Sequence, residues 1–172
     1  MQDVDTLFLE VSKAIDEQNL AEAKTLLEEI LTIDPAYGRA HNHLGWIYET
    51  KIKDFERAKM HYEFALKFCQ DTYPVVYLNY GYLLLEHGQL DAAEKIIAKG
   101  LTVQGVDRST LYYQKGKVAE QRMQLNRALD YYQQAYRMNV SKDLESLLSI
   151  EINRVKSKLS FWEKMKIKLG IF

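Results

Sequence analysis

A spacing of 35 residues dominates this sequence and limits what it can fold into. Small residues recur at Ala23, Ala58, Ala93 and Ala128. Four positions further along, the same spacing returns the large residues Leu27, Tyr62, Ile97 and Tyr132. A period of 20 to 50 residues is typical of solenoids, in which every repeat is one supersecondary unit that buries its apolar face against its neighbours. We therefore expect a repeat array.

Each unit is predicted to be a pair of antiparallel helices. In the third unit, Leu90, Ala93, Ile97 and Leu101 form an apolar stripe at the helical period. Polar or glycine-containing triplets such as "EQN", "HGQ" and "RMQ" separate the paired helices. The chain gives no strand signal before its last ten residues. The predicted helices are 5–17, 20–33, 37–51, 54–69, 73–87, 90–103, 107–122 and 125–138, with a ninth beginning near residue 142.

Glycines at Gly45, Gly81 and Gly116 fall inside predicted helices. A glycine there costs about 1 kcal/mol relative to alanine. We expect close packing of the helix pair to offset this cost, with Gly81 and Ala93 on facing sides of one pair. The second unit carries one extra residue in its inner turn, within "TKIKDF".

The bulk composition excludes several classes of protein. The formal net charge is -1, which argues against a general nucleic-acid binder. A lone cysteine rules out an internal disulfide and fits a reducing compartment. The sequence contains no stretch of about 18 apolar residues, so we expect no membrane-spanning helix. The first residues lack the features of a signal peptide, so the expected location is the cytoplasm.

No set of side chains suggests catalysis. His41 and His43 are two residues apart and point to different faces of a helix, so they cannot chelate a metal as an i, i+4 pair would. His87 lies at a helix end, and Cys69 has no histidine near it in sequence. We therefore expect no enzyme activity, no cofactor and no metal. The tyrosines fall largely on packing positions, which disfavours base stacking.

The repeat pattern resembles the tetratricopeptide repeat. Unit two carries the resemblance best, with Leu44-Gly45, Tyr48, Phe55, Ala58, Tyr62 and Ala65-Leu66, and the third and fourth units keep the same register. The resemblance covers about residues 4–140. It implies an all-α fold: a right-handed α-solenoid of four such repeats (about 4–36, 37–72, 73–106 and 107–140), followed by a C-terminal capping helix and tail in 141–172.

The same resemblance implies a concave groove lined by the first helix of each unit. The groove positions that would contact a protein or peptide partner are Asn42, His43, Trp46, Asn79, Tyr82, Tyr113, Gln114 and Lys117. Related co-chaperones hold a C-terminal carboxylate with a clamp of five donors. Only Asn79 matches that clamp here, which argues against carboxylate binding.

The C-terminal segment leaves the repeat pattern. Leu144, Leu148, Ile152, Val155, Leu159 and Trp162 form a helical stripe that suits a cap over the last repeat. From Met165 onward, apolar residues alternate with lysines, which suggests a strand or extended segment. We expect this tail to dock on protein, through Trp162, Ile167, Leu169 and Phe172. The alternative is contact of its lysines and aromatic residues with an anionic membrane, which so short a segment would anchor weakly.

The leading functional hypothesis is a non-catalytic adaptor or scaffold that binds a peptide or helix of a partner protein in the groove. The alternative is a structural module that forms homo-oligomers through its C-terminal tail.

Overall fold

The computed structural model describes residues 3–69 and 72–169. Every regular element in these ranges is helical, so the predicted all-α class is confirmed. The chain divides into two compact units, residues 1–83 and 84–172, and the division falls inside helix α5 (Val75–Glu86).

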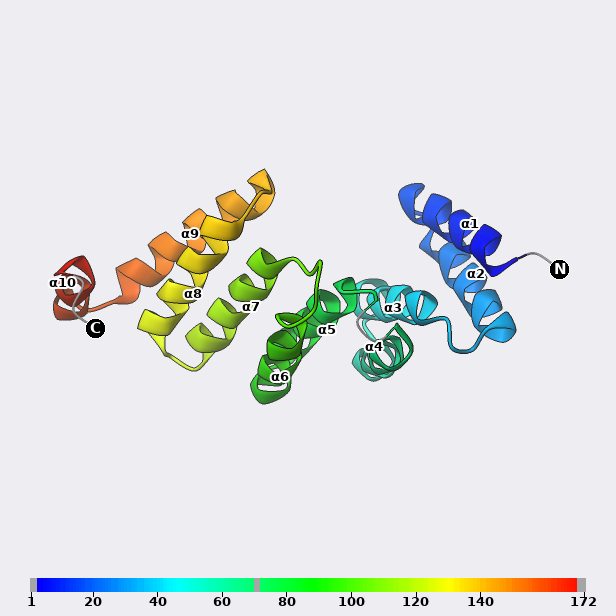
Figure 1. Ribbon diagram of the computed structural model, residues 1–172, viewed down its shortest axis with the longest axis horizontal. Coiled ribbons are helices and arrows are strands. Elements are labelled where there is room, and N and C mark those ends of the chain that lie inside the picture. Colours follow the sequence, from blue (N-terminus) through cyan, green and yellow to red (C-terminus); the bar gives the residue numbers. More distant parts are fainter. Residues whose placement is uncertain (1–2, 70–71, 170–172) are drawn as a thin grey trace. The chain divides into compact units, whose positions relative to one another are not determined.

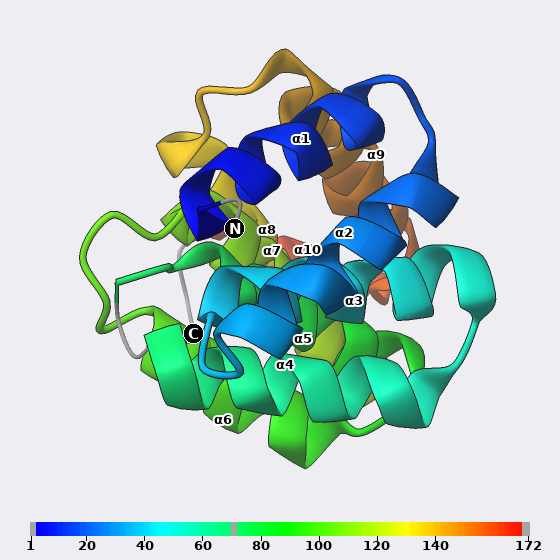
Figure 2. The same cartoon turned by 90° about the vertical axis from the view of Figure 1, so that its right-hand side faces the viewer.

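Unit 1 contains two packed helix pairs. Helix α1 packs against α2, and α3 packs against α4. Within each pair the two helices lie side by side (Figures 1 and 2). Its elements are α1 (Val4–Asp16), α2 (Leu20–Ile33), α3 (Gly38–Ile47), the π-helix η1 (Tyr48–Ile52), α4 (Phe55–Cys69) and the part of α5 up to Leu83.

Unit 2 is built the same way and ends in two further helices. Helix α7 packs against α6 and α8, and α9 packs against α8 (Figure 1). Its elements after the end of α5 are α6 (Leu90–Gly100), α7 (Arg108–Gln121), α8 (Leu125–Met138), α9 (Lys142–Lys158) and α10 (Phe161–Leu169). The observed helices agree with the predicted ones to within a few residues, apart from α10.

The residues that define the 35-residue period form the core. Ala23, Ala58, Ala93 and Ala128 are fully buried, and so are the large residues four positions after each of them. A close-packed interior tolerates little change in side-chain volume, which explains why every repeat keeps a small residue at the first position and a large one four positions later.

The helix glycines make room for aromatic rings. A Cβ atom built on Gly45 would come within 2.8 Å of Cδ1 and Cε1 of Tyr62. A Cβ atom on Gly116 would come even closer to the ring of Tyr132. In these two pairs the atoms nearest to the glycine belong to the tyrosine of the second helix. The close approach of a ring therefore offsets the cost of glycine in a helix. The close approach of Gly81 and Ala93 stays a prediction.

Each helix pair turns at a residue in the left-handed conformation. These residues are Gln18, Lys53, Gly88 and Met123, with φ of 60°, 60°, 67° and 60°, and they also repeat every 35 residues. Only one of the four is a glycine, the residue that adopts this conformation without a steric cost. A single left-handed residue costs roughly 1–2 kcal/mol in other side chains, so the packing of each pair must outweigh it.

The extra residue of the second unit is accommodated by a π-helix. Residues Tyr48–Ile52 continue α3 with π-helical hydrogen bonding, and Lys53 ends the element in the left-handed conformation. The backbone N–H of Asp54 then donates to the carbonyl of Tyr48 at 3.0 Å. An insertion absorbed within a helix is the usual origin of a π-bulge. The helix pair keeps its packing because the added residue widens one turn.

The C-terminal segment confirms one expectation and corrects another. Helix α9 begins at Lys142 and buries Leu148 and Val155, as expected of a capping helix, and Leu159 directly after it is also buried. The strand or extended segment expected from Met165 onward is wrong within the described residues, because residues 161–169 form α10. Its sequence is rich in Lys, Met, Glu and Leu, which favour helices. A helix also satisfies its own backbone groups, whereas a lone strand has no partner to pair with.

The expected tail-docking residues fall partly outside what the structure describes. Trp162, Ile167 and Leu169 lie within the bounds of α10, and Phe172 lies outside the described residues. The side chain of Leu169 is 65% exposed in the single chain. Docking of this segment on protein stays a prediction.

Candidate functional site

Unit 1 presents a face made by α3 and α5. The side chains of His43, Trp46, Asn79 and Tyr82 are half-buried there, which leaves part of each accessible to a partner. Asn42 is only 2% exposed, and its Oδ1 accepts a hydrogen bond of 3.2 Å from Nδ2 of Asn79. The expectation that Asn42 lines an open groove is therefore wrong: it is an internal link between the two helices.

Helix α1 and the connector before α3 add aromatic side chains to this face. The ring of Phe8 lies edge-on to Tyr37 at 5.5 Å and to His43 at 5.4 Å between centroids. Burial, and secondarily the positive charge of Arg39, lower the pKa of His43. The imidazole is therefore neutral at pH 7. We call the set Phe8, Tyr37, His43, Trp46, Asn79 and Tyr82 the unit 1 face.

The corresponding positions of unit 2 are covered. Gln114 is 0% exposed and Tyr113 is buried, so the expectation that they line an open groove is wrong. Lys117 is half-buried, and its Nζ lies 3.5 Å from Oε1 of Glu151 on α9. The capping helix α9 thus spans the side of α7 that the sequence assigned to a partner.

An ionic cluster joins α7 to α9 in unit 2. The carboxylate of Glu120 accepts from Nη2 of Arg154 at 2.6 Å, from Nζ of Lys158 at 2.9 Å and from the hydroxyl of Tyr132 at 3.0 Å. Nε of Arg154 also donates to Glu151 at 2.9 Å. Burial raises the pKa of Glu120, but the hydrogen bonds from Arg154, Lys158 and Tyr132 outweigh it and lower this pKa to about 2.

Unit 1 contains a hydrogen bond equivalent to one of these. The hydroxyl of Tyr62 donates to Oε2 of Glu49 at 2.5 Å. Sequence reasoning missed both tyrosine–glutamate pairs. A signal was present, because Glu49 and Glu120 each follow a helix glycine by four residues. The spacing places each glutamate one turn after the glycine against which the tyrosine ring packs.

Two histidines that lie far apart in sequence meet in unit 1. Nδ1 of His41 and Nδ1 of His61 are 3.0 Å apart, and Nε2 of His41 lies 3.1 Å from the carbonyl of Pro35. A carbonyl only accepts, so neutral His41 carries its proton on Nε2 and accepts at Nδ1 from Nδ1–H of His61. Burial lowers the pKa of His41; burial, followed by the neighbouring His41, lowers that of His61 to about 4. The pair is a neutral link between α3 and α4.

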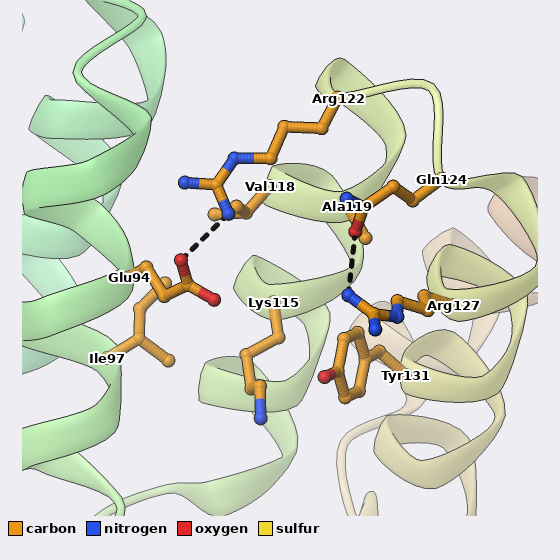
Figure 3. A pocket seen from close by; sticks show the side chains of 9 residues that line it. All are labelled: Glu94, Ile97, Lys115, Val118, Ala119, Arg122, Gln124, Arg127 and Tyr131. Atoms are coloured by element: carbon orange, nitrogen blue, oxygen red, sulfur yellow. Dashed lines mark hydrogen bonds and ion pairs between the residues drawn. The ribbon is translucent and has the colours of Figure 1, made fainter.

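A charged crevice lies between α6, α7 and α8 of unit 2 (Figure 3). Arg122 bridges Asp91 and Glu94, the latter at 2.7 Å, and Nζ of Lys115 lies 4.4 Å from the ring centroid of Tyr131. The interior volume is about 20 Å³, room for about one water. The crevice is therefore a packed seam between helices and not a ligand pocket.

Two further properties bear on function. Among the described residues, no group of three or more His, Cys, Asp or Glu side chains is arranged to hold a metal ion. Within the same ranges, every helix is too short or too polar to cross a lipid bilayer.

Comparison with known proteins places the fold. A tetratricopeptide-repeat family model matches residues 38–72, which carry the second predicted unit. No curated protein matches the sequence.

Several solved structures share the fold at low sequence identity. PilF of Pseudomonas aeruginosa has a TM-score of 0.79 and 22% identity, covering 90% of this chain and 68% of that one. PilW, described as a widely conserved type IV pilus biogenesis factor, has a TM-score of 0.70 and 16% identity, covering 91% and 76%. A double mutant of MamA RS-1 has a TM-score of 0.70 and 15% identity, covering 99% and 97%. Residues 38–72 therefore match a tetratricopeptide repeat, and the chain as a whole shares the fold of these solved structures.

Proposed function

We propose that this protein is a non-catalytic adaptor or scaffold that binds a peptide or helix of a partner protein on the unit 1 face. The observation that carries the proposal is the contrast between two equivalent surfaces. When Gly45 and Gly116 are taken as equivalent, His43 on α3 is half-buried, whereas its counterpart Gln114 on α7 is 0% exposed. A partner that binds this side of the first helix of a repeat is therefore expected to bind in unit 1.

The chemistry of the unit 1 face suits a largely apolar segment with a few polar groups. Trp46 and Tyr82 are of the residue types that dominate binding hot spots. The amide of Asn79 offers a donor and an acceptor to a peptide backbone. His43 is neutral at pH 7, so it adds a polar contact without a charge to desolvate. We expect a partner with an aromatic or aliphatic anchor and little net charge at the contact.

Affinity capture with matched variants tests this assignment. The triple variant Trp46→Ala, Asn79→Ala and Tyr82→Ala should lose the captured partner while its helical circular dichroism signal is retained. A control triple variant on exposed positions of α4, Glu56→Ala, Met60→Ala and Lys67→Ala, should capture as well as the wild type. Equal capture by both triple variants would move the binding site away from the unit 1 face.

Self-assembly is the second candidate function. Leu169 and Phe161 are exposed in the single chain, so α10 offers a surface on which a second copy of the protein can pack. Light scattering at two protein concentrations separates the candidates, because a self-assembling module gains mass with concentration. We further propose a cytoplasmic location, in keeping with the lone cysteine, Cys69, whose thiol is free and buried.

A further inference from the structure

The C-terminal helix α10 carries an exposed apolar stripe. Phe161, Met165 and Leu169 are spaced four residues apart, which places them on one side of the helix. All three are exposed, Phe161 by 68% and Leu169 by 65%. Single exposed apolar side chains are ordinary, but a row of three along a nine-residue helix marks an interaction surface.

Lysines border this stripe. Residues 156–169 contain five lysines and one glutamate, although the whole chain has a formal net charge of -1. Lys164 and Lys168 of α10 and Lys156 of α9 surround a hollow of about 380 Å³ that also has Leu129 and Leu159 in its lining. In the part of the chain that the structure describes, no carboxylate pairs with any of these three lysines. Their charges are therefore available to an anionic partner.

We propose that α10 and the lysine-bordered hollow beside it dock the protein on the surface of an anionic phospholipid membrane. Phe161, Met165 and Leu169 enter the boundary between headgroups and acyl chains, and the lysines contact lipid phosphates. A helix of nine residues is about 14 Å long. It is too short to cross a hydrocarbon core of about 30 Å, so it lies in the plane of the interface.

The proposal revises the expectation that the tail docks on protein and not on a membrane. That expectation assumed an extended segment from Met165 onward, in which the lysines point to the side opposite the apolar residues. The helical form gathers the three on one side and brings Lys164 and Lys168 to the same hollow as Lys156. An amphipathic helix with basic residues beside its apolar side binds anionic interfaces.

The charge distribution favours lipid over a second copy of α10. Pairing two α10 helices through their stripes would bring Lys164 and Lys168 of both copies close together, with Glu163 as the one acidic residue in 156–169. Like charges at such a contact repel. An anionic membrane neutralises all of these lysines at once. The proposal goes beyond the adaptor function and does not depend on it.

Sedimentation of the full chain with lipid vesicles tests the proposal. Wild type should pellet with vesicles of phosphatidylcholine that contain about one-third phosphatidylserine, and bind vesicles of phosphatidylcholine alone much more weakly. The double variant Phe161→Ser and Leu169→Ser should weaken binding at least about tenfold, since the buried apolar area sets the affinity. The variant Lys164→Glu and Lys168→Glu should weaken it by about 25-fold or more, at about fivefold for each lysine removed.

Matched changes elsewhere serve as controls. Leu9→Ser and Lys13→Glu alter an exposed leucine and an exposed lysine of α1, and each should leave vesicle binding unchanged. An unchanged melting temperature in all variants shows that unfolding does not cause the loss. In the variant Trp46→Phe, Trp162 is the one remaining tryptophan, and its fluorescence should shift to shorter wavelength on addition of anionic vesicles.

Two results would overturn the proposal. If the wild-type protein stays in the supernatant with anionic vesicles, a membrane is excluded as the binding partner of α10. If that same protein is a dimer that Phe161→Ser and Leu169→Ser convert to monomer, the occupant is a second copy. Vesicle binding that survives both α10 variants would place any membrane contact elsewhere on the chain.

Discussion

Helices α3 and α7 occupy equivalent places in their repeats, yet the side chains on their outward sides differ in solvent accessibility. On α3, His43 and Trp46 remain partly accessible. On α7, Gln114, the counterpart of His43, is buried, and Lys117, the counterpart of Trp46, pairs with Glu151 of α9. The difference teaches that the position of a residue within a repeat does not decide whether it can bind. What lies against it decides, and in unit 2 that is the capping helix.

The two units also hold their helix pairs with different electrostatics. Both use a tyrosine that donates to a glutamate, Tyr62 to Glu49 and Tyr132 to Glu120. Unit 2 adds Arg154 and Lys158 to its glutamate, so that α9 is tied down by charge. Unit 1 adds a neutral histidine pair, His41 and His61. The units should therefore respond differently to packing changes and to pH.

The largest expected effect comes from loosening the capping helix. Leu148 of α9 is fully buried, so Leu148→Ala should cost about 3 kcal/mol of unfolding free energy. Hydrogen-exchange mass spectrometry should show protection falling in α7, α8 and α9 by more than in α1 to α4. The control Ile150→Ala changes a residue of the same helix that is 64% exposed and should shift stability by less than about 0.5 kcal/mol.

An equal loss of hydrogen-exchange protection in the two units would contradict the proposal that α9 covers and stabilises unit 2 specifically. It would mean that α9 supports the whole array and not specifically the surface of α7 beneath it.

Acidification should weaken unit 1 before unit 2. The pKa of His61 is about 4 in the folded chain, below its ordinary value of 6.5, because of burial and of His41. Lys24 and Arg57 lower it further, and Glu28 opposes them. Between these two values the unfolded chain binds a proton that the folded chain does not. Stability is therefore lost as the pH falls through 6.5 and levels off near 4, with a loss of about 2 kcal/mol at pH 5.

Glu120 loses its contribution in the same direction, on acidification, but at lower pH. Its pKa is about 2 in the folded chain and 4.5 ordinarily, so its contribution is present above 4.5 and is lost only between about pH 4.5 and 2. Urea unfolding of Trp162→Phe, followed by the fluorescence of Trp46 in unit 1, measures the first effect. His61→Gln should remove most of the dependence between pH 6.5 and 4. Identical urea midpoints at pH 7.5 and 5 in the parent protein would refute the histidine assignment.

The smallest expected effect comes from the helix glycines. Gly116→Ala gains about 1 kcal/mol of helix propensity and incurs about 1–3 kcal/mol of overpacking against the ring of Tyr132. This ring cannot easily withdraw, because it is fully buried and bonded to Glu120. We expect a net loss of about 1 kcal/mol, and a smaller loss for Gly45→Ala, where the clash with Tyr62 is milder. Urea denaturation of both variants measures the difference. Stabilisation by both would show that ring packing does not select the glycines.

Much of the fold follows from the sequence because its information is local and repeated. The 35-residue period located the helix pairs, and the buried alanines and the large residues four positions later are where the period placed them. The repeated turn positions also carried a signal in "EQN", "HGQ" and "RMQ". The form that the extra residue took, the π-helix Tyr48–Ile52, did not follow, because an insertion can be absorbed in a turn or a helix.

The candidate site was less predictable. Asn42, Tyr113 and Gln114 have the polarity of surface residues, but contacts with other helices bury them. The His41–His61 pair joins residues 20 positions apart, which no local pattern predicts. The tail was misread because alternation over a few residues fits both a strand and one side of a short helix. The choice between them depended on whether a partner strand was present.

The sequence by itself determined the repeat class, the helix pairs and the residues of the core, because the same burial pattern recurs four times and each copy supports the others. The tertiary structure alone decided which side of a repeat remains accessible. That depends on where α9 lies against α7 and on the hydrogen bonds of Glu120 with Arg154 and Lys158, which join residues more than 30 positions apart. Burial of a polar side chain is settled by such distant contacts, because they supply the partners that replace water.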